Sequence, residues 1–158
     1  MQRKRWITIV MVTIFALMLA GCGGSGEEPT PEAAAPATAQ EAIDQTLEVA
    51  MHDLYYGDNN NNIAEPPVWT VKSGAQVQVN MDNQGGLQHN WAVVKPGAEV
   101  PVPYDAAKNS GILLFEAGVV ETGQQGSHIF TAPEAGEYTV ICTVAGHYPS
   151  MQGKLVVE

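Results

Sequence analysis

Four side chains of this sequence could bind one soft metal ion together. Cys142, His147 and Met151 follow one another at the spacing C-x4-H-x3-M, and His89 stands upstream in the motif Gln-His-Asn-Trp. A thiolate, two imidazoles and a weak thioether form a ligand set that selects copper, with the methionine as a distant axial ligand. Each residue alone would be unremarkable, because methionines and cysteines usually fill cores. Together they predict a mononuclear blue-copper site that carries single electrons.

The segments around these residues explain how the ligands could converge. Residues 140–142 are expected to end one strand, and residues 153–155 to begin the next. Gly146 and Pro149 would shape a tight turn between the two strands. His89 would arrive from a different strand. Protein side chains then fill every coordination position, which favours electron transfer over catalysis.

The first 21 residues resemble an export signal. A basic start at residues 3–5 precedes an apolar run over residues 6–20, which is shorter than the ~20 residues of a membrane-spanning helix. Residues 19–22, Leu-Ala-Gly-Cys, resemble a bacterial lipobox, in which a signal peptidase cuts before the cysteine and Cys22 is lipidated. The alternatives are an ordinary secretory signal with a chance cysteine, and an uncleaved anchor.

The cysteine count agrees with export and with metal binding. The sequence holds only two cysteines, although an exported protein reaches a compartment that permits disulfides. If Cys22 is lipidated, Cys142 is the sole remaining thiol, and metal ligation would protect it from oxidation. Residues 22–41 are rich in Gly, Pro, Ala and Glu, which predicts a flexible linker. A single domain over residues 42–158 would follow it.

The charge of the exported chain excludes some partners. Removal of residues 1–21 leaves four basic residues and all 17 acidic ones. Such acidity argues against binding to nucleic acid and against electrostatic attachment to anionic lipid. It suits a soluble monomer whose copies repel one another, with a basic docking partner as a weaker expectation.

Residues 42–158 show the alternation of apolar and polar residues that is typical of strands. Val77, Val79 and Met81, for example, alternate with glutamine and asparagine. Strands are expected over residues 47–51, 68–72, 77–81, 87–94, 112–120, 128–131, 137–142 and 154–157. Short strands between Gly, Pro and Asn turns predict an all-β, antiparallel Greek-key sandwich or barrel of about seven to eight strands. A helical turn is expected only in the connection over residues 98–111.

The remaining candidates for chemistry have ordinary interpretations. His52 and His128 each lie in a strand-like segment, and neither has a second ligand at metal spacing. The tract Asp58–Asn62 is expected to be an exposed loop, because asparagine tolerates irregular backbone. It lacks the acidic spacing of a calcium loop, which leaves a calcium site as the minor alternative.

Three motifs resemble a known family. They are Gln88-His89-Asn90-Trp91, the Phe-Thr-Ala-Pro and Gly-x-Tyr pattern over residues 130–138, and residues 142–157. On these motifs the chain from about residue 42 to residue 158 resembles the cupredoxins and, among them, the auracyanins, membrane-attached blue-copper proteins of filamentous anoxygenic phototrophs. The gap between Cys142 and His147 has the length found in azurins and exceeds that of plastocyanins.

The resemblance implies roles for residues beside the ligands. Asn90 would tie the two ligand segments together by hydrogen-bonding toward Thr143, and a backbone amide would reach the Cys142 sulfur. Such contacts orient metal ligands and tune the metal. The carbonyl of Gln88 stands where azurins offer a weak fifth oxygen, although azurins usually have glycine there.

The resemblance also implies a function. The protein would be a lipid-anchored one-electron shuttle outside the cytoplasmic membrane, with the edge of His147 as the exit for the electron. Its donor would be a quinol-oxidising complex, and its acceptor a photosynthetic reaction centre or a terminal oxidase. The alternative is a surface module that stores or delivers copper. An enzyme is not expected, because multicopper enzymes need more histidines than the four present here, and a binuclear centre needs a second ligand cysteine.

Overall fold

Strand β4 (Gln76–Asn83) shows how the alternation in the sequence becomes structure. Its odd-numbered residues, from Val77 to Asn83, are buried, and the residues between them are partly exposed. The computed structural model describes residues 42–158. In this part of the chain nine strands form, more than the seven to eight expected, because the two-residue strand at residues 55–56 was not predicted. The other eight are β1 (Gln45–His52), β2 (Tyr55–Tyr56), β3 (Val68–Val71), β5 (Ala92–Val94), β6 (Leu113–Glu116), β7 (Gln125–Thr131), β8 (Gly136–Ile141) and β9 (Gln152–Val157).

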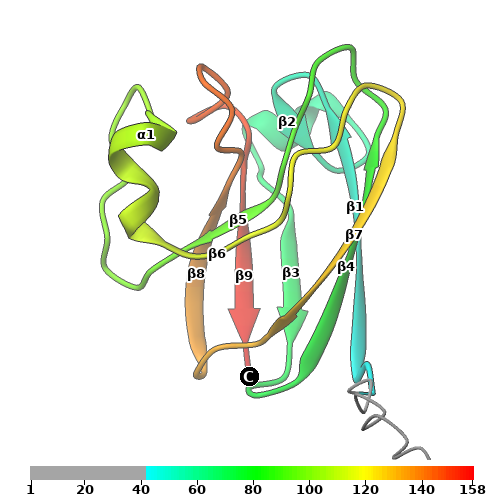
Figure 1. Cartoon of the computed structure of the whole chain (residues 1–158), viewed down its shortest axis with the longest axis vertical. Helices are drawn as coiled ribbons and strands as arrows, with labels where there is room; N and C mark the ends of the chain where they lie inside the picture. Colours follow the sequence, from blue (N-terminus) through cyan, green and yellow to red (C-terminus); the bar gives the residue numbers. More distant parts are fainter. Residues whose placement is uncertain (1–41) are drawn as a thin grey trace, which may run out of the picture. The chain divides into compact units, whose positions relative to one another are not determined.

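The strands form two mixed sheets that pack as a β-sandwich (Figure 1). One sheet has the order β2-β1-β4-β7, and the other has the order β3-β9-β8-β5-β6. The all-β sandwich is confirmed, but a purely antiparallel arrangement is wrong, because β1 pairs with β4 and β3 with β9 in parallel. Between β1 and β4 the chain crosses to the other sheet as β3. This extra strand returns it to its starting end, so β4 runs in the same direction as β1.

Two predicted strands are shorter than expected, and both shorten near the predicted ligand His89. The segment predicted over residues 87–94 is a strand only at β5, and the segment over residues 112–120 is a strand only at β6. Beyond these strands, His89 and Val120 form one isolated bridge with two backbone hydrogen bonds of 3.1 and 2.7 Å. His89 therefore lies in a loop that is fixed to its neighbour rather than in a continuous strand.

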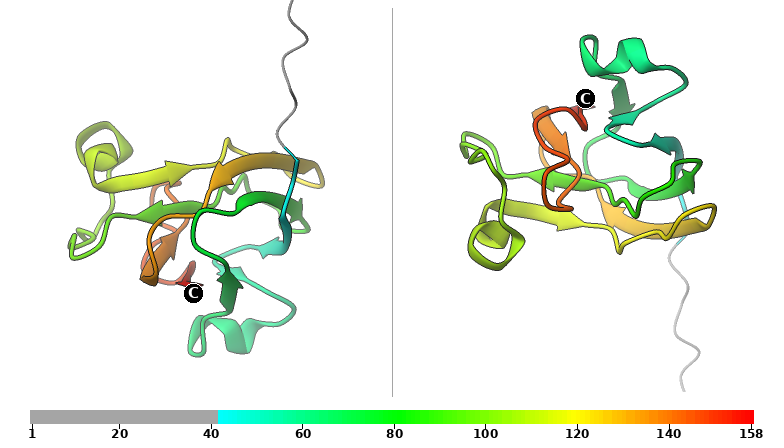
Figure 2. Two further views of the ribbon diagram at one scale, coloured as in Figure 1. Left: turned by 90° about the horizontal axis from the view of Figure 1, so that it is seen from below. Right: turned by 90° about the horizontal axis from the view of Figure 1, so that it is seen from above.

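The short helices lie outside the sheets. Helix α1 (Ala106–Asn109) and the 3-10 turn η2 (Ser110–Ile112) occupy the connection in which a helical turn was expected. The asparagine tract is not an irregular loop throughout: η1 (Asn60–Ile63) is a 3-10 turn whose first N–H groups are capped by the Asn59 side chain, as asparagine favours. In the end-on views of Figure 2, α1 and η1 lie on opposite sides of the sandwich. No helix within residues 42–158 is long and apolar enough to span a membrane.

Aromatic rings fill the space between the sheets. Trp91 is fully buried, and its ring lies 5.9 Å from that of Trp69 and 5.7 Å from that of Phe130, measured between ring centres. Phe115 stacks on Phe130 at 4.9 Å. Trp69 is partly buried and packs against this cluster. The ligand motif Gln-His-Asn-Trp is therefore anchored in the core by Trp91, two residues after His89.

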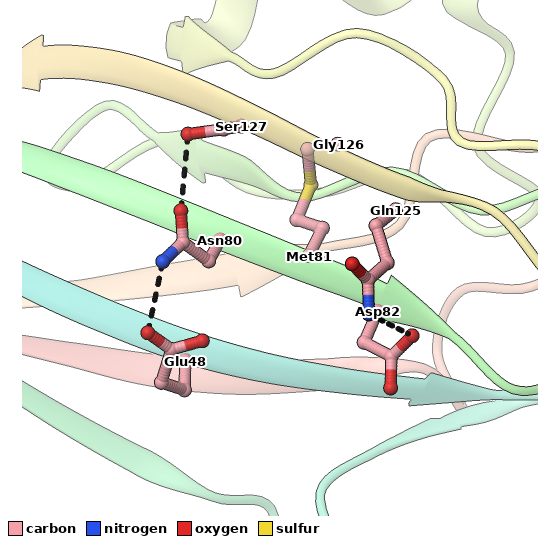
Figure 3. A pocket seen from close by; sticks show the side chains of 7 residues that line it. All are labelled: Glu48, Asn80, Met81, Asp82, Gln125, Gly126 and Ser127. Atoms are coloured by element: carbon pink, nitrogen blue, oxygen red, sulfur yellow. Dashed lines mark hydrogen bonds between the residues drawn. The ribbon is translucent and has the colours of Figure 1, made fainter.

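The outer face of β1, β4 and β7 is polar. Asn80 donates to Glu48 over 2.9 Å and accepts from Ser127 over 3.0 Å, so one side chain links all three strands (Figure 3). Gln125 donates to Asp82 along the same face. These side chains line a shallow depression. The polar residues of the alternating pattern thus face outward on these strands, where they hydrogen-bond to one another.

The burial of β9 leads to a test of the core. Leu155 is fully buried, whereas Leu114 on β6 is 45% exposed. Leu155→Ala should lower the free energy of unfolding by about 2–5 kcal/mol, because it removes apolar contacts and leaves a cavity. The matched change Leu114→Ala should lower it by about 1 kcal/mol or less. Urea unfolding of the metal-free domain measures both, and equal losses would contradict the assignment of β9 to the core.

Candidate metal centre

The segment between β8 and β9 is a closed loop held by its own backbone. The Cys142 N–H donates to the Met151 carbonyl over 3.1 Å, and the Met151 N–H donates to the His147 carbonyl over 2.8 Å. A third bond runs from the His147 N–H to the Val144 carbonyl over 3.1 Å. Gly146 has a φ of +85°, a conformation that glycine adopts without strain. The loop therefore brings Cys142 and Met151 together at its two ends, and His147 lies between them in the loop.

The upstream histidine meets this loop at one end of the sandwich. The β8–β9 loop and the β4–β5 loop, which carries His89, both lie at the end opposite the C-terminus (Figure 1). His89 Nδ1 lies 3.1 Å from His147 Nδ1, and Cys142 Sγ lies 3.5 Å from the same nitrogen. The donor atoms of these three residues all lie within 4.8 Å of one another. The structure thus brings together the three strong ligands predicted from the sequence.

The chemistry and burial of the donors fit a copper ion. His89, Cys142 and Met151 have no exposed surface, and His147 is only 5% exposed. Two imidazole nitrogens that face each other this closely repel unless one carries a proton or a cation lies against both. A buried set of two imidazoles, one thiolate and one thioether is the set that suits a blue-copper centre. When bound, copper supplies one-electron redox chemistry at this site.

The protonation of the ligands is set mainly by their burial. Burial lowers the pKa of His89, although the neighbouring Asp53 opposes this effect. Burial also lowers the pKa of His147, and the positive charge of a protonated His89 would lower it further. Both imidazoles are therefore held neutral, the form that binds metal. Burial raises the pKa of the Cys142 thiol, while the backbone N–H groups of Asn90 and Val144 favour the thiolate.

Asn90 joins the two ligand segments. Its Nδ2 donates to Thr143 Oγ1 over 2.6 Å, and its Oδ1 accepts from the Thr143 N–H over 2.8 Å. These bonds lie between the residue after His89 and the residue after Cys142, which are 53 positions apart in the chain. They are the contacts that the family resemblance implies for Asn90 and Thr143. The distance between the two ligand segments is thereby fixed by a pair of buried hydrogen bonds.

Three partners of this region were missed in the sequence. Glu116 Oε1 accepts from Asn90 Nδ2 over 2.9 Å and from Thr143 Oγ1 over 2.7 Å. The Tyr56 hydroxyl donates to the Asn90 carbonyl over 2.6 Å, and Asp53 lies beside His89. All three come from distant strands or turns, and no local motif marks them.

The other candidate residues lie apart from the site. His52 stacks on Tyr55 with ring centres 4.8 Å apart, and His128 Nε2 accepts from the Gly118 N–H over 3.2 Å. Both lie in strands, as expected. The fifth ligand from the Gln88 carbonyl stays a prediction. The export signal, Cys22 and the linker lie outside the described residues.

The clamp made by Asn90 leads to a matched test. Asn90→Ala leaves the buried Thr143 N–H without a partner, which costs about 1–3 kcal/mol, and it frees the His89 segment to move. The variant should therefore unfold at lower urea and release copper faster. The control Asn80→Ala removes an amide with three side-chain hydrogen bonds from the solvent-facing network and should change stability by about 0.5 kcal/mol at most. Equal effects of the two variants would argue against a special role of Asn90.

Comparison with known proteins places the chain in a family. The profile of copper binding proteins of the plastocyanin/azurin family matches residues 52–158. Auracyanin-A of Chloroflexus aurantiacus is 30% identical over 168 aligned positions, which cover 98% of this chain and 97% of that protein.

Solved structures agree with this result. The structure of auracyanin A superposes with a TM-score of 0.59 at 33% identity, covering 72% of this chain and 98% of that one. The structure of auracyanin B gives a TM-score of 0.61 at 28% identity, covering 75% and 91%. His89, Cys142, His147 and Met151 thus form the type 1 copper site of this fold. The chain belongs to the plastocyanin/azurin family of copper-binding proteins, the cupredoxins, and is a blue copper electron-transfer protein rather than an enzyme.

Proposed function

We propose that this protein is a lipid-anchored electron shuttle outside the cytoplasmic membrane, working as a monomer between two membrane redox complexes. The observation that carries the shuttle is the closed, buried ligand set, in which only His147 has any exposed surface and a substrate could not reach the metal position. The export signal and the lipobox at Cys22 support the location. A quinol-oxidising complex is the proposed donor, and a photosynthetic reaction centre or a terminal oxidase is the proposed acceptor. In support, the solved relative auracyanin A is described as a "blue" copper protein from a photosynthetic bacterium.

The exposure of the ligands supports His147 as the exit for the electron. It is the one ligand of the four with exposed surface, at 5%. Gly146 and Pro149 on either side are exposed, and Tyr148 is partly exposed. A partner that covers this part of the loop would approach the imidazole edge without water between them. A small contact of this kind suits rapid turnover.

Storage or delivery of copper is the second candidate, and burial argues against it. A module that hands over copper needs a site from which the ion leaves quickly, whereas the ligands here come from two clamped segments. Exchange of copper would require the Asn90–Thr143 contacts to open.

The visible spectrum tests the copper site as an electron carrier. The protein loaded with copper(II) should show an intense thiolate charge-transfer band and should be reduced and reoxidised reversibly. Cys142→Ser should abolish the band, and His128→Gln, a histidine in β7 away from the site, should leave it unchanged. Copper binding without a strong band would overturn the electron-transfer assignment. Rapid loss of copper to a mild chelator would instead favour storage or delivery.

Fatty-acid labelling tests the anchor separately. The full chain, expressed in a bacterium fed with an alkyne fatty acid, should incorporate the label at Cys22, and Cys22→Ser should lose it. Cys142→Ser is the matched control, because it removes the other of the two cysteines and should keep the label. Incorporation of the label is measured instead of membrane fractionation, because an uncleaved signal would also hold the protein at the membrane and the two cases could not be told apart by fractionation. Unlabelled wild-type protein would contradict the lipid anchor and leave the copper site unaffected.

A further inference from the structure

The copper ligand His89 has a carboxylate on its far side. Its Nδ1 faces His147 within the site, and its Nε2 points the opposite way and lies 3.3 Å from Asp53 Oδ1. His89 is fully buried, whereas the Asp53 side chain is 47% exposed. Asp53 is located in the turn between β1 and β2, far in sequence from every ligand. A solvated charge therefore contacts the buried ligand directly.

The surroundings hold the Asp53 carboxylate in this position. The Leu87 N–H donates to Asp53 Oδ1 over 3.0 Å, and the Gly86 backbone N–H also donates to the carboxylate. Loss of hydration alone would raise the pKa of Asp53, but the hydrogen bonds from Leu87, His89 and Gly86 together outweigh it and hold that pKa below its usual value. The carboxylate thus accepts hydrogen bonds from the loop that precedes His89 as well as from His89 itself.

The absence of a side chain at Gly85 leaves room for this contact. A Cβ at Gly85 would lie 2.9 Å from the Asp53 backbone nitrogen and 3.1 Å from His89 Nε2. Any larger residue would push the two groups apart. On the other side, Leu54 has a φ of +72°, a left-handed conformation that is costly for a leucine. The strained residue of this turn is thus the one directly after Asp53.

We propose that Asp53 is a positioning residue of the copper centre, which accepts a hydrogen bond from His89 Nε2–H and lowers the reduction potential through its negative charge. The bond fixes the tautomer of His89 with the proton on Nε2, which leaves the Nδ1 lone pair free for copper. The charge favours copper(II) over copper(I), because the oxidised ion carries one more positive charge. This inference rests on the copper site described above and adds a residue that tunes it.

Three variants separate the charge of Asp53 from its hydrogen bonds. Asp53→Asn keeps an acceptor oxygen for His89 and Leu87 but removes the charge, and Asp53→Ala removes both. Asp82→Asn is the matched control: it removes a carboxylate near the end of β4 whose side-chain partners are Gln84 and Gln125, not a copper ligand. All three are made in the full chain, and their folding is checked by urea unfolding.

The reduction potential of the copper-loaded protein measures the effect of the Asp53 charge on the copper centre. Asp53→Asn should raise it, and a tenfold selective loss of copper(II) affinity corresponds to a rise of about 59 mV. Asp82→Asn should shift it by less than half as much. Asp53→Ala should also weaken copper(II) binding about 10–100-fold, as the loss of a hydrogen bond to a ligating histidine does elsewhere. An unchanged potential in both Asp53 variants would overturn the role of the charge.

In the metal-free protein, the hydrogen bond between His89 and Asp53 can be tested without any redox measurement. Nitrogen chemical shifts of His89, recorded at a pH where the ring is neutral, should show the Nε2–H tautomer in the wild type and in Asp53→Asn. In Asp53→Ala they should show a mixture of tautomers. A purely structural role of Asp53 in the turn would lower the unfolding free energy and leave the tautomer unchanged, which would overturn the proposal. Failure of the wild type to give a blue copper form would contradict the proposed function, whereas the tautomer would still report on Asp53.

Discussion

The pair of hydrogen bonds between Asn90 and Thr143 is the constraint on which the copper site depends. The ligands come from two segments, with 53 positions between His89 and Cys142, and β strands alone cannot hold two loop ends at ligand distance. The amide of Asn90 satisfies both the N–H and the hydroxyl of Thr143, and Tyr56 fixes the Asn90 backbone from the opposite sheet. Because these groups are buried, each unmade bond would cost about 1–3 kcal/mol. The clamp therefore has one stable arrangement, and His89 and Cys142 take their positions from it.

The rest of the fold supports this clamp from both sides. Trp91 follows Asn90 and is fixed among the core rings, while β8 runs directly into Cys142. The ligand loop closes on its own backbone between β8 and β9. Each ligand is thus at most one residue from a group that cannot move without opening the core or the loop. A site held in this way changes little when its charge changes, which is the property that an electron carrier needs and that an enzyme with an open coordination position does not.

Features that depend on residues close together in the sequence could be predicted for this protein. Three ligands fall within ten residues, and alternation marks nearly every strand, so the copper site and the all-β sandwich are predictable. The direction of pairing is not local: β1 and β4 are parallel only because β3 lies between them in the other sheet. The partners Asp53 and Glu116 are likewise set by the meeting of turns and strands that are distant in sequence. A carboxylate in a turn has the same local pattern whether it faces water or a metal ligand.

The positions of these two carboxylates follow from the cost of burying charge. A carboxylate placed inside the site would lose its hydration, and its attraction to the centre would have to offset that loss. Asp53 is 47% exposed at its side chain and Glu116 is an exposed residue of β6, yet each reaches a buried group through one oxygen. Asp53 contacts the ring of His89, and Glu116 contacts Asn90 and Thr143. Solvated charges can in this way act on a buried centre through the hydrogen bonds of its ligand segments. Removing one of them alters the electrostatics of the centre while the apolar core that holds the ligands stays intact.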